Sequence, residues 1–99
     1  MTSTNSPIDW RARAVASPAV MIRQLGEESV LLDLSTQSYF GLDETGTRMW
    51  AALTQASNLE AAFAKLRDEY EVQPAMLRAD MGRFVEALRV ERLIEVVVE

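Results

Sequence analysis

The chain has 99 residues, 48% of them hydrophobic, with no cysteine, no histidine and a formal net charge of −5. This length suits one domain with a modest core. The missing residue types exclude disulfides, thiolate chemistry, histidine acid–base catalysis and the usual zinc sites. The negative charge disfavours a phosphate-neutralising surface, and so a nucleic-acid partner. We therefore expect a chain that is not an enzyme and holds no cofactor or metal.

The first 18 residues begin "MTSTNSPIDWRARA" and are predicted to be a flexible lead-in to a single domain over residues 19–99. The stretch lacks the apolar segment of a signal peptide. No apolar run elsewhere approaches the ~20 residues that span a bilayer. We expect a cytoplasmic protein without a membrane partner.

Three short runs of alternating side chains follow, which predicts a three-stranded antiparallel meander. Gly26 in "LGEES" offers the first turn and the polar "STQS" the second. The residues expected on the buried face are Val20, Ile22, Val30, Leu32, Leu34, Phe40 and Leu42. Those expected on the opposite face are Arg23, Asp33, Tyr39 and Gly41.

Three helices are predicted next, each with a recognisable start: Asp43 as N-cap, the capping box Ser57-Asn58-Leu59-Glu60, and Pro74 at a first position. The stripes expected in the core are Gly46, Met49, Trp50 and Leu53, then Leu59, Ala62, Phe63, Leu66 and Tyr70, then Leu77, Met81, Phe84 and Leu88. Glycine inside a helix costs roughly 1 kcal/mol, so we expect a segment packed closely against Gly46 and Gly82. The β-branched tail "LIEVVVE" predicts a short final strand.

Strands grouped before helices predict an α+β domain with the three helices packed on the small sheet. Three helices beside a hairpin sheet also have the outline of a winged helix. That comparison is geometric and does not settle function.

The third strand, Tyr39 to Leu42, lacks the charge and proline that normally blunt an exposed sheet edge. Such an edge can bind an extended peptide through its main chain, while alternate side chains set the register. An alternative is that Phe40 and Leu42 are plain core residues and that Gly41 marks a bend. The sequence leaves both interpretations open.

The run "SVLLDLSTQSYFGLDETGTRMWAAL", followed by a helix pair and "LRADMGRFVEALRVERLIE", resembles the PqqD-like proteins. Their pattern includes hydrophobic–Leu-Asp-Leu, a turn, two aromatic positions before x-Leu-Asn/Asp, and a later helix with Asp-hydrophobic-x-x-Phe. The resemblance covers about Val20 to Ile94. Gln37 departs from it, because many relatives have glycine there, and "LDLSTQSYFGLD" is closer to members serving lasso-peptide and related pathways than to those of pyrroloquinoline quinone (PQQ) synthesis.

The resemblance implies a non-catalytic recognition module that binds the leader segment of a ribosomally made precursor peptide. The leader would add a strand to the third strand, beside the third helix, and a partner enzyme would act on the tethered remainder. That partner would be a radical SAM enzyme in the quinone branch, or a leader peptidase with a cyclase in the lasso branch. The residues expected to contact the peptide are Tyr39, Phe40, Gly41, Leu42, Met76, Asp80, Arg83 and Phe84. Asp80 and Arg83 are equally compatible with solvated surface charges.

Two other functions fit a small acidic domain. A DNA-binding winged helix needs a basic recognition helix, but in the third helix and just beyond it Asp80, Glu86 and Glu91 are interleaved with the arginines. A carrier protein needs an Asp-Ser-Leu segment that opens a helix, whereas Asp33-Leu34-Ser35 ends a strand. Both are weaker than the peptide-binding interpretation.

Overall fold

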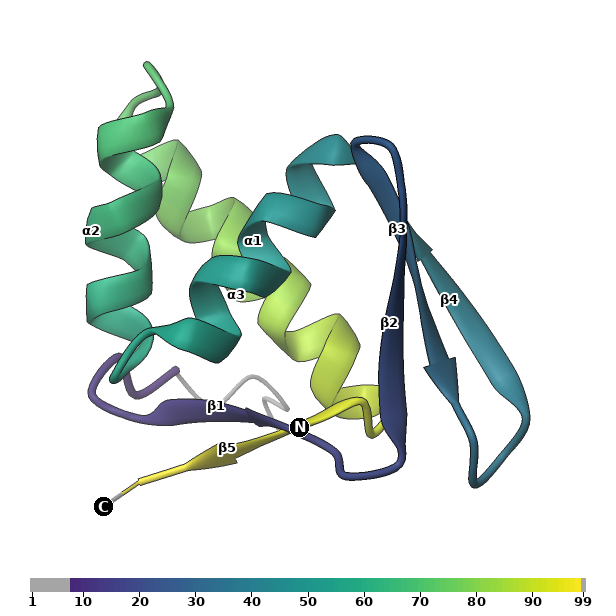
Figure 1. The fold of residues 1–99 in the computed structure, drawn as a ribbon. Coiled ribbons are helices and arrows are strands. Elements are labelled where there is room, and N and C mark those ends of the chain that lie inside the picture. The colour runs from purple at the N-terminus through teal and green to yellow at the C-terminus, as the bar shows by residue number, and fades with distance from the viewer. Residues whose placement is uncertain (1–7, 99) are drawn as a thin grey trace, which may run out of the picture.

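The computed structural model describes residues 8–98, which form three helices and two small sheets (Figure 1). The elements in chain order are β1 Arg13–Ala16, β2 Val20–Leu25, β3 Glu28–Asp33, β4 Ser38–Leu42, α1 Glu44–Gln55, α2 Leu59–Glu69, α3 Pro74–Val90 and β5 Ile94–Val97. The sheet β2–β3–β4 is an antiparallel meander beside the helices, and the pair β1–β5 runs across one end of them. The predicted α+β class, the meander and the three following helices are confirmed.

The lead-in predicted for residues 1–18 is corrected where the structure describes it. Residues 13–16 form β1 and pair antiparallel with β5. Ala12 and Ala14 are 0% and 4% exposed and belong to the core. The carbonyls of Trp10 and Ala12 accept hydrogen bonds from the first two amides of α2, Glu60 N–H at 2.9 Å and Leu59 N–H at 2.8 Å. These amides lack hydrogen-bond partners within their own helix, so the segment that contains Trp10 and Ala12 caps the start of α2. The composition of the lead-in did not reveal this contact. Residues 1–7 lie outside the described part.

The predicted buried face of β3 was wrong. Leu31 is 0% exposed, whereas Val30 and Leu32 are only half-buried and Leu34 is 60% exposed. Ile22, which pairs with Leu31 and was also expected inside, is 43% exposed. The run of three apolar residues offers an apolar face in either phase, so periodicity alone could not choose between the two.

Two polar side chains on the buried face of β3 find partners. Asp33, expected to face solvent, is buried, and its carboxylate accepts hydrogen bonds from the Ser35 hydroxyl at 2.7 Å and backbone N–H at 3.0 Å. The Ser35 hydroxyl bond holds the pKa of Asp33 below its ordinary value. Ser29 and Thr47 of α1 share a buried hydroxyl–hydroxyl bond of 2.7 Å. Because buried polar groups must be paired, this bond fixes where α1 lies on the sheet.

The helix caps follow the sequence with one correction. The Asp43 carboxylate accepts from the Gly46 N–H at 2.7 Å and caps α1, as predicted. For α2 the cap is Asn58 rather than Ser57, since the Asn58 side chain accepts from the Ala61 N–H at 2.8 Å. Asparagine and serine cap helices about equally well, so the one-residue difference depended on where the chain enters α2.

The core lies among the three helices and the inner faces of both sheets. Nearly all predicted stripe residues are buried, with Phe84 and Tyr70 half-buried at the margin. The close approaches predicted at the helix glycines are also present: a Cβ on Gly82 would lie 3.4 Å from Ile8 Cδ1, and one on Gly46 would lie 3.4 Å from Leu42 Cβ. No helix within residues 8–98 is long and apolar enough to cross a membrane.

Candidate functional site: a groove beside the β4 edge

A groove of about 540 Å³ opens between β4, the start of α1 and the middle of α3. β4 contributes its last three residues together with Asp43, α1 contributes its first turns, and α3 contributes residues one turn apart. The lining residues are Phe40, Gly41, Leu42, Asp43, Thr45, Gly46, Met49, Asp80, Arg83 and Phe84. The groove therefore joins a strand to a helix that follows it more than thirty residues later.

The main chain of β4 is available at this groove. Leu34 N–H donates to the Ala19 carbonyl at 2.9 Å, so the even-numbered residues of β3 turn their amides toward β2 and the odd-numbered ones turn theirs toward β4. In the register, the odd residues of β3 face the even residues of β4. The N–H and C=O groups of Tyr39 and Gly41 thus point to the outer edge, where no strand within residues 8–98 pairs with them.

The floor of the groove is apolar. Leu42 and Met49 are each 5% exposed, and Phe84 is half-buried over the same core. Gly46 packs closely under this floor, because a Cβ there would lie 3.3 Å from Asp43 Oδ1 and 3.4 Å from Leu42. A side chain entering the groove would meet hydrocarbon and sulfur, which favours an apolar residue.

The charges at the rim are largely satisfied within the protein. Asp80 and Arg83 form an ion pair one turn apart on α3. The Asp43 carboxylate is used by the α1 cap. Thr45 adds a hydroxyl at the rim. The site therefore offers main-chain groups and an apolar floor rather than a strong field of one sign.

Six of the eight peptide-contact residues expected from the sequence line the groove, and two do not. Tyr39 is 78% exposed and its side chain leaves the sheet on the side opposite Phe40, so only its main chain faces the edge. Met76 is 60% exposed and lies outside the lining. The sequence missed Asp43, Thr45, Gly46 and Met49. The direct step from strand to N-cap at Asp43 was the available signal, since it forces the first turn of α1 against the end of β4.

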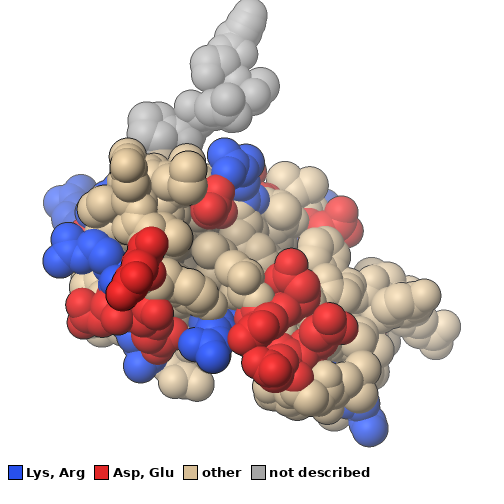
Figure 2. Space-filling view, turned by 90° about the horizontal axis from the view of Figure 1, so that it is seen from above, with Lys and Arg blue, Asp and Glu red and all other residues tan. Residues whose placement is uncertain are grey.

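No arrangement of metal-ligating side chains occurs within the described residues. The arginines of α3, which a DNA-reading helix would present to phosphates, are each engaged by a carboxylate. The pairs are Arg78 with Glu60 at 2.7 Å, Arg83 with Asp80, and Arg89 with Glu86. On the face seen in Figure 2, acidic and basic side chains are interspersed and form no continuous basic surface. The helix therefore lacks the electrostatic character of a recognition helix.

Comparison with known proteins agrees with this geometry. Residues 28–94 match the family model of coenzyme PQQ synthesis protein D (PqqD). One solved structure, TbiB1 in complex with the TbiA(beta) leader peptide, is 34% identical, with a TM-score of 0.77 over 82% of this chain and 94% of that one. A second, lasso peptide synthetase B1 complexed with the leader peptide, has the same fold at 23% identity, with a TM-score of 0.76 over 85% of this chain and 99% of that one. No curated protein sequence gives a significant match. The family match over most of the chain and the relative at 34% identity show that the chain belongs to the PqqD family.

Proposed function

We propose that the chain is a non-catalytic adaptor that binds the leader segment of a ribosomally made precursor peptide and presents the remainder to a modifying enzyme. The observation that carries the proposal is the free edge of β4, whose outward main-chain groups open onto an apolar groove. Membership of the PqqD family and the leader complex of the 34% identical relative support the same function.

The leader would add as a fourth strand to the meander. Hydrogen bonds to the N–H and C=O of Tyr39 and Gly41 supply affinity that depends little on leader sequence. Alternate leader side chains would point toward the helices and enter the groove over Leu42, Met49 and Phe84. Apolar side chains at that spacing would fix the register, because a slip by one residue would turn them away from the groove.

The adaptor would contribute to the pathway by raising the effective concentration of the core peptide at the enzyme. A leader held on the adaptor brings its attached core peptide to the enzyme as an intramolecular partner, at local concentrations on the order of millimolar for short flexible linkers. A leader that is disordered when free loses conformational entropy on docking, so the groove contacts must exceed that cost. The enzyme is a leader peptidase with a cyclase in a lasso-type pathway, or a radical SAM enzyme in a quinone-type pathway.

An amide-resolved NMR titration tests the proposal. The labelled chain is titrated with the TbiA(beta) leader that the solved relative binds and, separately, with the leader half of a candidate precursor peptide. We expect saturable shifts concentrated on Tyr39–Leu42 and on residues 80–84 of α3. A duplex DNA titration in low and moderate salt is the control. Shifts with DNA alone, lost in salt, would replace the adaptor with the winged-helix DNA binder.

A further inference from the structure

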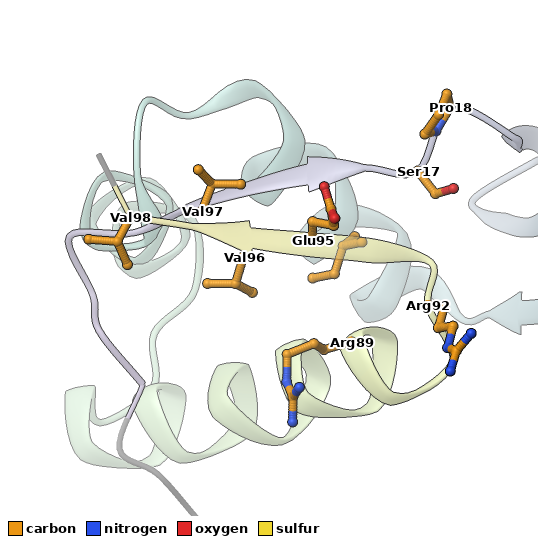
Figure 3. A pocket seen from close by; sticks show the side chains of 9 residues that line it. Ser17, Pro18, Arg89, Arg92, Glu95, Val96, Val97 and Val98 are labelled. Atoms are coloured by element: carbon orange, nitrogen blue, oxygen red, sulfur yellow. The ribbon is translucent and has the colours of Figure 1, made fainter.

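A second, larger groove lies at the other sheet. It has a volume of about 910 Å³ and runs along β5 and the end of α3. Its lining residues are Ser17, Pro18, Arg89, Arg92, Ile94, Glu95, Val96, Val97 and Val98. In Figure 3, Val96 and Val98 lie on the same side of β5 as Arg89, whereas Glu95 and Val97 point to the opposite side.

β5 presents a free edge to this groove. Ser17 N–H donates to the Leu93 carbonyl at 3.0 Å, so the odd-numbered residues of this segment turn their main-chain groups toward β1. The N–H and C=O groups of Ile94, Val96 and Val98 therefore point away from β1. In the part of the chain that the structure describes, β1 is the only strand that pairs with β5.

Arg92 stands beside this edge in a conformation that arginine rarely takes. Two backbone hydrogen bonds close the C-terminal end of α3. Arg92 N–H donates to the Arg89 carbonyl at 3.0 Å, and Leu93 N–H donates to the Leu88 carbonyl at 2.9 Å. In this helix ending the residue in the left-handed region is usually glycine, yet Arg92 occupies it at φ 62°. A side chain held against its backbone preference points to a use for that side chain.

Two of the three charged residues that line this groove are basic, namely Arg89 and Arg92, and the third is Glu95. Arg92 pairs with no carboxylate among the described residues, and Arg89 pairs only with Glu86. The hydrogen bond from Arg89 keeps the pKa of Glu86 below its ordinary value, so that pair stays ionised near neutral pH. Glu95 extends from the opposite side of the strand. A ligand over Val96 and Val98 thus meets the guanidinium of Arg92 and that of Arg89, which is already shared with Glu86, on a chain of net charge −5.

We propose that the β5 edge is a second strand-addition site, which binds an extended acidic segment of a protein partner. The segment would hydrogen-bond to the main chain of Ile94, Val96 and Val98, place small apolar side chains over the two valines, and direct a carboxylate to Arg89 and Arg92. Arginine suits this role because its planar fork binds carboxylates through two parallel hydrogen bonds. β4 and β5 belong to different sheets, so this site does not depend on the leader groove.

The test uses two capped octapeptides, one alternating valine with glutamate and the other alternating valine with lysine. Each is titrated into the labelled full chain while amide shifts are followed by NMR. We expect the glutamate peptide to shift the amides of Ile94, Val96 and Val98 and to bind about tenfold or more tightly than the lysine peptide. Arg92→Gly should weaken the glutamate peptide at least about fivefold while the midpoint of thermal unfolding stays equal or rises, because glycine suits the left-handed position.

Four results would overturn the proposal. These are no shift with the glutamate peptide, equal affinity for both peptides, unchanged affinity of Arg92→Gly, and shifts at Tyr39–Leu42 in place of β5. Shifts of the β5 amides on raising the protein concentration without peptide would overturn it too, because they would make a second copy of the chain the occupant. Failure of leader binding at β4 would leave all these readouts unaffected.

Discussion

Replacing Gly41 by proline tests the β4 edge at a single main-chain atom. The N–H of Gly41 points to the free edge, so proline removes a donor that no bond inside the meander uses. One such bond contributes about 0.5–1.5 kcal/mol net, and a leader carbonyl left without a partner adds to the loss. We expect leader affinity to fall by about 1–3 kcal/mol, which is roughly 5- to 150-fold in Kd.

The matched control is Gly41→Ala, which keeps the N–H. A Cβ built on Gly41 meets no atom within 4 Å, so alanine should leave the fold intact and the affinity close to that of the wild type. Affinities are measured by isothermal titration calorimetry with the precursor's leader half, and folding by denaturant unfolding of each variant. Wild-type affinity in a folded Gly41→Pro variant would refute the placement of the leader on this edge.

Three further changes probe the scaffold around the groove. Gln37→Gly should stabilise the chain by about 0.5–1 kcal/mol in urea unfolding, because Gln37 sits at φ 60°, and an unchanged midpoint would contradict that strain. Ser29→Ala should lower the free energy of unfolding by about 1–3 kcal/mol, because it leaves the Thr47 hydroxyl unpaired. Adding Thr47→Val should recover part of that loss. A double variant no more stable than Ser29→Ala alone would contradict this reasoning. The hydrogen bond and charge of Glu27 raise the pKa of Glu44 above 4.5. The native state therefore binds the proton of the Glu44 carboxyl more tightly than the unfolded chain does. Repulsion between the two carboxylates destabilises the native state above the folded pKa, and this loss is relieved as the pH falls through that pKa. Glu27→Gln should therefore raise the urea midpoint more near pH 7 than at about pH 4. Equal gains at both pH values would contradict repulsion between Glu27 and Glu44.

The candidate site was predictable where local rules decide the backbone. The Asp43 cap and the alternation of Phe40 and Leu42 both follow from short segments of sequence, and both are present in the structure. Met76 was also expected at the site, but only the packing of α3 determines which of its turns reaches β4. Tyr39 shows the same limit, since its main chain and its side chain face different surroundings.

The sequence by itself determined the meander, the three helices and the short final strand, but it missed β1. Alternation, caps and the proline at the start of α3 act over a few residues, so the meander and the three helices could be read without the fold. Only the tertiary structure decided which face of β3 is buried, because three consecutive apolar residues fit either phase. It also decided that residues 13–16 pair with β5, since hydrogen bonds between strands nearly eighty residues apart leave no local pattern. The free edges that the two proposals use, at β4 and β5, follow from the same long-range choices of partner.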